Sequence, residues 1–164
     1  MKDKILIIGG AGFIGMHLAK FLIQNRECEV TLADYSFARD ELEYFSVQQL
    51  SNINFIKDDF SSSLAFDVLD KDFDFVYMLA SVVGVNNTLE HPEEVIRVNT
   101  SLIFNCLEWL KTTTVKRVLF TSTSETYSGT TEVLDYPIPT DELVPLCIQD
   151  VSDPRFTYAI TKIL

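Results

Sequence analysis

Short apolar runs alternate along this chain with longer stretches in which apolar residues recur every three or four positions. The run Ile5–Ile8 ends at a pair of glycines, which is typical of a central parallel strand buried on both faces. The stretch that follows, Phe13–Ile23, has the spacing of an amphipathic helix. The same reasoning predicts further strands at Val30–Ala33, Ile53–Ile56, Phe73–Ala80 and Val115–Thr121, and helices at Glu41–Leu50, near Leu64–Leu69 and at Glu93–Leu110.

The order of these elements determines the expected fold class. Strands that alternate with helices through short connections favour right-handed crossovers and a doubly wound parallel sheet, so we expect an α/β protein with helices on both faces. The segment Gly129–Pro154 contains four prolines and predicts a long loop, after which Arg155–Leu164 is expected to begin a helix. A length of 164 residues is sufficient for one domain with its own core.

The balance of charge excludes some classes of partner. The chain has 24 acidic and 13 basic side chains, a formal charge of −11, and no cluster of basic residues. Such a charge repels the backbone of a nucleic acid, so nucleic-acid binding is not expected. A ligand that carries phosphate must therefore be held by backbone N–H groups and a few side chains, which points to a small cofactor.

Cysteine usage and hydropathy bear on the compartment. Cys28, Cys106 and Cys147 lie far apart and lack the spacing of metal ligands, so we expect buried thiols and no metal site. The apolar stretch Ile5–Ile23 is interrupted by four glycines, a histidine and a lysine, so we expect neither a signal peptide nor a membrane span. Both observations favour the cytoplasm.

A glycine-rich segment joins the first predicted strand to the first predicted helix. Residues 9–15, GGAGFIG, satisfy GxxGxxG and the overlapping GxGxxG. A lone fingerprint of this kind is compatible with a simple tight turn, but Asp34 ends the second strand 34 − 15 = 19 residues after the last glycine, where dinucleotide-binding proteins place the acid that binds the adenosine ribose. Asp34 would repel a 2′-phosphate and the nearest following base is Arg39, so NAD is favoured over NADP.

Tyr158 and Lys162 are the candidate catalytic pair. On a helix their i and i+4 spacing places them on one face, and an ammonium beside a phenol favours the phenolate, a plausible general base. An ordinary amphipathic helix also produces such pairs. The fifth strand runs into the hydroxyl-rich segment Thr121–Tyr127, whose hydroxyls either cap turns or relay a substrate proton toward Tyr158.

Taken in order, these motifs resemble those of the extended short-chain dehydrogenase/reductase family, the NAD-dependent nucleotide-sugar epimerase/dehydratase group. The resemblance covers essentially the whole chain and implies an NAD-binding Rossmann fold. It rests on the glycine segment, Asp34, Asp58–Phe60, Leu79–Ser81, Asn99, Ser122–Glu125 and the Tyr158/Lys162 pair.

The resemblance also implies a role for each of these residues. By position, the pyrophosphate would be held by Gly9, Gly12, Phe13, Ile14 and Gly15, the ribose by Asp34, the adenine end by Asp59 and Phe60, and the middle of the cofactor by Leu79, Ala80 and Ser81. Asn99 would either bridge helices or contact the cofactor, which Tyr158 and Lys162 would also touch. Thr123 takes the place of the catalytic Ser or Thr, and Glu125 lies two residues beyond it.

The implied reaction has one shared opening and three endings. The tyrosinate removes a proton from the sugar C4 hydroxyl while hydride moves from C4 to NAD. Epimerases then return hydride to the other face, decarboxylases lose the C6 carboxylate, and dehydratases eliminate water. Dehydratases of the group carry Asp–Glu after the catalytic threonine, whereas Ser124 and Glu125 follow Thr123 here, so we rank epimerase first, decarboxylase second and dehydratase third.

Two other classes of function stay open at this point. A non-catalytic NAD-binding regulatory module would not need Thr123, Tyr158 and Lys162 together, and a reductase of small carbonyls fits poorly with Glu125 and the long loop. Relatives continue for roughly as many residues again with a C-terminal substrate-binding lobe, and usually form homodimers through the long helix and the Tyr/Lys helix. We therefore expect residues 1–164 to be an incomplete NAD-binding domain with an exposed fifth strand, without turnover of a nucleotide sugar on its own.

Overall fold

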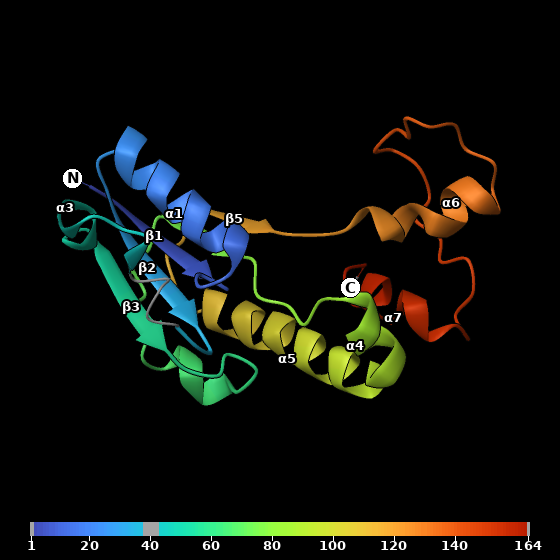
Figure 1. Ribbon diagram of the computed structural model, residues 1–164, viewed down its shortest axis with the longest axis horizontal. Helices are drawn as coiled ribbons and strands as arrows, with labels where there is room; N and C mark the ends of the chain where they lie inside the picture. The colour runs from blue at the N-terminus through green and yellow to red at the C-terminus, as the bar shows by residue number, and fades with distance from the viewer. Residues whose placement is uncertain (1, 38–42, 164) are drawn as a thin grey trace. The chain divides into compact units, whose positions relative to one another are not determined.

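The computed structural model describes residues 2–37 and 43–163 (Figure 1). The chain forms two compact units. The first contains the residues up to Ser81 together with Ser101–Phe120, and the second contains Val82–Thr100 and the chain from Thr121 onward. The long helix α5, Pro92–Leu110, confirms the expected helix in that region and belongs partly to each unit.

The first unit is built on a sheet of five parallel strands. Its order is β3-β2-β1-β4-β5, so the chain starts in the centre, winds to one edge and then returns to fill the other side. This reversal between β1 and β4 is the arrangement of a doubly wound Rossmann sheet and confirms the predicted α/β class. The strands are β1 (Asp3–Ile8), β2 (Cys28–Asp34), β3 (Ile53–Lys57), β4 (Phe75–Met78) and β5 (Arg117–Phe120).

The core is centred on β1. Residues Ile5–Ile8 are all 0% exposed, as expected for a strand with neighbours on both sides and cover on both faces. Helix α1 (Phe13–Asn25) buries Met16, Ala19 and Leu22 against one set of these side chains. From α5, Trp109 is also buried, and it packs on two aromatic rings from the segment before β4 at centroid distances of 5.9 and 6.3 Å.

The structure differs from the sequence-based prediction in the connections. Within the helix expected at Glu41–Leu50, the first two residues lie outside the described part of the chain and Glu43 is helical. After a break at residues 44–46, the helix α3 (Val47–Leu50) begins at a Ser46/Gln49 capping box. The helix expected near Leu64–Leu69 is a single 3-10 turn, η1 (Ser63–Phe66). Helical segments this short gain little from propensity, so each depends on local support: the capping box at α3, and the burial of Ala65 and Phe66 at η1.

The second unit consists of short helices and a long loop. They are α4 (Val85–Glu90), η2 (Ser124–Tyr127), α6 (Ser128–Glu132), η3 (Pro154–Phe156) and α7 (Thr157–Ile160). The first residues of the predicted loop Gly129–Pro154 are therefore helical, as part of α6. The helix α4 was not predicted. The loop is tied back to α6, because Gly129 N–H donates to Cys147 O at 2.7 Å and the Thr130 hydroxyl donates to Pro145 O.

Strand β5 forms one edge of the sheet and is exposed along its length. Val118, Leu119 and Phe120 are 42%, 47% and 36% exposed, in agreement with the exposed fifth strand expected from the sequence. An exposed apolar edge strand has unpaired backbone N–H and C=O groups that can pair with a strand of another chain. Among the helices of the described residues, none has the length and apolar character that a membrane crossing requires.

Candidate active site

The first unit presents the glycine segment at the carboxyl end of β1. The N–H groups of Gly9 and Gly10 both donate to Ala33 O, at 2.8 and 3.1 Å, which ties the turn to the end of β2. Gly9 has φ +88°, in the region that only glycine adopts at little cost. The turn therefore leaves the strand sharply and delivers the chain to the start of α1.

The glycines of this segment serve different purposes. A Cβ on Gly9 would lie 2.5 Å from Ala80 N, and one on Gly15 would lie 2.6 Å from Gly9 O, so the chain itself excludes a side chain at both positions. At Gly12 the nearest atom would be Gly9 O at 3.4 Å, an ordinary contact. The fold alone does not require glycine at Gly12, which is the behaviour expected of a residue kept small for an approaching pyrophosphate.

Helix α1 begins with free donors. Its N-cap is Gly12, no side chain caps its first turn, and that turn contains no acidic residue. Phe13 and Ile14 are 81% and 64% exposed. The unpaired backbone N–H groups and the positive end of the helix dipole suit this terminus to an anionic phosphate.

Asp34 holds the glycine turn as well as standing at the predicted ribose position. Its Oδ2 accepts the Ala11 N–H at 2.9 Å. Within the described residues its Oδ1 makes no hydrogen bond, and the side chain is partly exposed at the end of β2. One oxygen thus supports the loop, while the other is available to a ligand hydroxyl.

The residues predicted to bind the adenine end and the middle of the cofactor differ in exposure. Asp59 Oδ1 accepts Ser61 N–H at 3.0 Å, whereas Phe60 is only 3% exposed and packs edge-on against Phe66. Phe60 would thus contribute to an adenine site only by holding the Asp59 loop in place.

The residues predicted to line the middle of the cofactor follow β4. Leu79 and Ala80 lie beside the glycine turn, and the buried Oγ of Ser81 has no partner within the described residues. An orphaned hydroxyl is what a site completed by a polar ligand predicts.

In the second unit, Asn99 is a fully engaged bridge. It is 2% exposed, its Oδ1 accepts Val82 N–H at 2.7 Å, and its Nδ2 donates to Val82 O and to Thr161 Oγ1 at 3.2 and 3.3 Å. Of the two roles considered for this residue, the geometry favours the bridge. It connects α5 to the turn that carries Lys162.

The hydroxyl-rich segment forms the 3-10 turn η2. Thr123 is its N-cap and its Oγ1 accepts Glu125 N–H at 3.3 Å, so this hydroxyl takes the capping role that the sequence left open, while retaining a proton to donate. Glu125 Oε1 lies 3.9 Å from the Arg155 guanidinium. This places a carboxylate and a guanidinium side by side next to η2.

Tyr158 and Lys162 lie on consecutive turns at the end of the described chain. The helix expected from Arg155 is split into η3 and α7, yet Lys162 N–H still bonds Ala159 O at 3.0 Å, so the two side chains share one face. Lys162 is 5% exposed and its Nζ lies 5.6 Å from the centre of the half-buried Tyr158 ring. Burial lowers the pKa of Lys162 from 10.5 to about 8.

Three positioning residues were not predicted from the sequence. The Ser122 hydroxyl donates to Lys162 O at 3.4 Å, Thr161 donates to Tyr158 O at 2.7 Å, and Asn105 Nδ2 donates to Ser61 O at 2.8 Å beside the Asp59 loop. The bonds of Ser122 and Asn105 reach carbonyls 40 and 44 residues away in sequence, whereas that of Thr161 lies within its own turn. Residue spacing cannot predict bonds that span so many residues, although Ser122 belongs to the hydroxyl-rich segment.

Together these features are those of a dinucleotide-binding α/β protein in which Tyr158 and Lys162 are neighbours. The family model described as the NAD dependent epimerase/dehydratase family matches residues 5–164, and the chain belongs to this family. The cofactor of this family is NAD, as predicted from the glycine segment and Asp34. The glycine cradle, the uncapped start of α1 and the orphaned Ser81 hydroxyl fit that cofactor.

Curated relatives and solved structures agree on the family. A UDP-N-acetyl-alpha-D-glucosaminuronate decarboxylase from Bacillus cytotoxicus is 34% identical over 100% of this chain and 48% of its own length. The uncharacterized protein MJ1055 of Methanocaldococcus jannaschii is 32% identical over 99% and 49%, respectively. A crystal structure of UDP-galactose 4-epimerase matches with a TM-score of 0.75 and 28% identity, covering 98% of this chain and 48% of that one. The chain spans about half the length of the curated relatives it matches.

The contrast between two glycines tests the phosphate cradle. We expect Gly12→Ala to keep its thermal unfolding temperature but to lose at least about tenfold in NAD affinity, because a methyl group fits the chain yet enters the space proposed for pyrophosphate. Gly9→Ala should instead lose more than about 2 kcal/mol of unfolding free energy, because its φ and the Ala80 backbone both oppose a side chain. Calorimetric titration with NAD and thermal melting measure the two effects, and unchanged NAD binding by Gly12→Ala would contradict the cradle.

The buried ammonium of Lys162 makes stability depend on pH. Because its folded pKa, about 8, lies below the unfolded value, the charged form costs stability at pH 7, and the cost disappears as pH rises from about 8 to above 10.5. We expect Lys162→Met to be more stable than the parent at pH 7 by up to roughly 3 kcal/mol, with the difference shrinking over that range. Urea unfolding at several pH values measures this, with the exposed Lys111→Met as control. A difference that stays constant with pH would refute the assignment.

Proposed function

We propose that this protein is an NAD-dependent enzyme that acts on a sugar carried by a nucleotide, and that its reaction is a 4-epimerisation. The observation that carries the proposal is the Tyr158/Lys162 pair, in which a buried ammonium with a lowered pKa lies 5.6 Å from the phenol ring. The chain has this pair within a family that uses NAD. Relatives named as UDP-sugar epimerases and decarboxylases support a nucleotide sugar as the substrate class.

In this proposal the first unit holds the cofactor. The backbone N–H groups at the start of α1 bind the pyrophosphate beside Gly12, and the free oxygen of Asp34 binds the ribose hydroxyls. The segment Leu79–Ser81 lines the middle of the cofactor, where the Ser81 hydroxyl gains the partner it lacks. Bound NAD supplies a hydride acceptor for the sugar carbon.

The second unit supplies the groups that handle the proton. Tyr158, as phenolate, takes the proton of the sugar C4 hydroxyl, and the Lys162 ammonium stabilises that phenolate. Thr123 donates a hydrogen bond to the same sugar oxygen, since its lone pair is used by Glu125 N–H while its proton is free to be donated. Asn99 and Ser122 keep the Lys162 turn in place.

Decarboxylation is the second candidate for the reaction. A carboxylate-bearing sugar needs a cation, and Arg155 offers one beside Glu125. The 34% identity to the Bacillus cytotoxicus decarboxylase over the whole chain favours the same outcome. Dehydration ranks third, because Ser124 stands where dehydratases of this group have an acidic residue.

A purely regulatory NAD-binding module explains the second unit less well. Such a module has no need of a lysine that is 5% exposed beside a tyrosine, because burying an ammonium costs stability that binding alone does not repay. A small-carbonyl reductase is equally disfavoured by the long loop that precedes Tyr158. We place the protein in the cytoplasm, where its three free cysteines stay reduced, and burial raises the pKa of Cys106 to about 11.

Product analysis distinguishes these alternatives. For the complete gene product with NAD and UDP-glucuronate, we expect a product of unchanged mass and altered C4 stereochemistry, whereas loss of carbon dioxide or of water would identify a decarboxylase or a dehydratase. Tyr158→Phe should lower kcat by at least about 100-fold while NAD affinity changes little, because the general base is removed. NAD binding without conversion of any tested nucleotide sugar would favour the regulatory module instead.

We also propose that the protein is a homodimer that associates through α5. In the first-unit part of this helix, Phe104 and Leu107 are 57% and 50% exposed and lie one turn apart. These two neighbouring side chains form a short apolar stripe, and contiguous exposed apolar surface is typical of an interface. The pairing that the family resemblance implies uses the same helix.

A charge on this stripe tests the dimer. Phe104→Glu should convert a dimeric species to a monomer in light scattering coupled to gel filtration, because an unpaired carboxylate would be buried in the interface. Leu64→Glu, at a 73% exposed position of the same unit, is the matched control and should stay dimeric. A monomeric parent protein, or a dimer that tolerates Phe104→Glu, would refute the proposal.

A further inference from the structure

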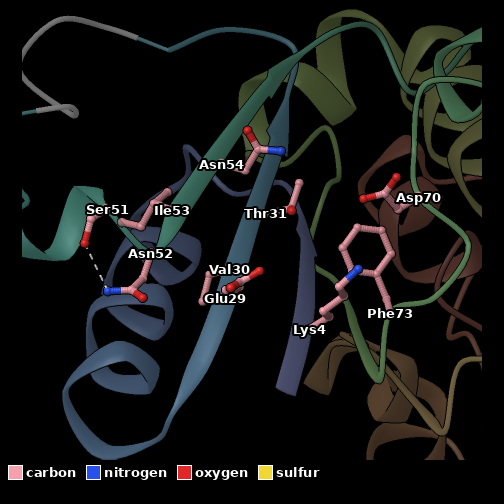
Figure 2. Close-up of a pocket in the computed structure, with 10 residues that line it drawn as sticks. All are labelled: Lys4, Glu29, Val30, Thr31, Ser51, Asn52, Ile53, Asn54, Asp70 and Phe73. Atoms are coloured by element: carbon pink, nitrogen blue, oxygen red, sulfur yellow. Dashed lines mark hydrogen bonds between the residues drawn. The ribbon is translucent and has the colours of Figure 1, made fainter. Parts of the chain in front are cut away.

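A pocket of about 230 Å³ lies at the amino ends of β1, β2 and β3, the end of the sheet opposite the glycine turn (Figure 2). It is separate from the proposed cofactor site, because Thr31 in its wall and Asp34 at the ribose position are three residues, roughly 10 Å, apart along β2. All of its walls belong to the first unit. None of the residues proposed to bind NAD or the nucleotide sugar lines this pocket.

The strand register brings four polar side chains onto one face of the sheet here. Lys4 of β1 is paired with Glu29 of β2, and Thr31 of β2 is paired with Asn54 of β3. Because Glu29 and Thr31 are two residues apart, both pairs point to the same face. Phe73, 4% exposed, closes the pocket from the segment before β4, as Figure 2 shows.

Thr31 is the unusual member of this wall. The residue is only 8% exposed, but its hydroxyl oxygen opens onto the pocket and is not one of the fully buried oxygens that lack a partner in the described residues, which belong to Ser81 and Ser128. Figure 2 shows the hydroxyl turned toward the space between β2 and the Lys4 and Phe73 side chains. A hydroxyl on the pocket wall can accept or donate a hydrogen bond there, so it is available to a ligand or an ordered water in the pocket.

Charge determines which ligands fit. The only ammonium in the wall, Lys4 Nζ, is bound to Asp72 at 2.6 Å, and this bond raises the pKa of Lys4. Glu29 and Asp70 also face the pocket; neither forms an ion pair within 4 Å in the described residues, although both add to the attraction that raises the pKa of Lys4. The pocket is thus rich in acceptors and carries excess negative charge.

A metal ion fits this arrangement poorly. Within residues 2–37 and 43–163 no group of three His, Cys, Asp or Glu side chains is close enough to hold one. Two separate carboxylates, a hydroxyl and an amide around an apolar ring instead match a ligand with several N–H donors and a short apolar body. A volume of about 230 Å³ admits a molecule of a few carbon atoms.

We propose that this pocket binds a small organic ammonium compound, with the Glu29 and Asp70 carboxylates and the Thr31 hydroxyl accepting its N–H groups and Phe73 contacting its carbon chain. The site is independent of the proposed reaction. It gives the molecule a second ligand at the far end of β2, the strand whose last residue, Asp34, supports the glycine turn.

The experiment is a titration of the purified protein with 1,4-diaminobutane at constant ionic strength, followed by the backbone amide signals of Thr31 and Asn54 in two-dimensional NMR. The uncharged 1,4-butanediol is the matched ligand control. Thr31→Val removes only the hydroxyl, and Glu29→Gln removes one charge at an exposed position. Glu132→Gln, at an exposed position of α6, removes the same charge from a residue that does not line the pocket.

We expect saturable shifts with the diamine and none with the diol. Thr31→Val should weaken binding about three- to tenfold, the effect of one lost hydrogen bond, and Glu29→Gln by at least as much, while Glu132→Gln stays within about twofold. Absence of saturable shifts at Thr31 and Asn54 would overturn the proposal. Equal affinity for the diol, or equal weakening by Glu29→Gln and Glu132→Gln, would overturn it too, since the second result indicates only general attraction to an acidic chain.

Discussion

The close approach of the glycine turn to the chain that leaves β4 is the constraint on which the cofactor half of this molecule depends. Ile8 O accepts the N–H groups of both Leu79 and Ala80, at 2.8 and 2.9 Å, so the two strand ends are clamped together. Gly9 must then pass within van der Waals contact of Ala80, which leaves no room for a side chain. The same contact determines where α1 starts, and it brings Leu79–Ser81 beside the proposed pyrophosphate site.

The second unit is organised around polar side chains that bond to backbone. Asn99 uses both ends of its amide, and the hydroxyls of Ser122 and Thr161 donate to backbone carbonyls of Lys162 and Tyr158. This compensates for the short length of α7, which has too few residues to be stable alone. A buried lysine can be held in a defined position only if its own backbone is held first.

Hydrophobic periodicity was sufficient to predict the sheet, because buried parallel strands such as Ile5–Ile8 are continuous apolar runs ended by glycine. Hydrophobic periodicity did not predict the connections between the strands. Helix α4 begins after Gly84, whose φ is +109°, and its only buried residue is Thr88, so its sequence has no apolar stripe. At the site, Asp34 and the glycines could be predicted from spacing, whereas Asn105 could not, because a bond to Ser61 O across 44 residues depends on packing alone. Cys147, expected to be buried, is half-exposed beside Gly129 in the loop.

The bond from Ala11 N–H to Asp34 Oδ2 has a consequence for any redesign of cofactor preference. Replacing this acid to admit a phosphorylated ribose would remove a repulsive charge and, in the same step, an anchor of the turn that cradles the pyrophosphate. Selectivity and loop rigidity are therefore coupled through one carboxylate. An amide at this position would keep a hydrogen-bond acceptor for Ala11 while removing the charge, so asparagine is a more conservative starting point for such a change than alanine or glycine.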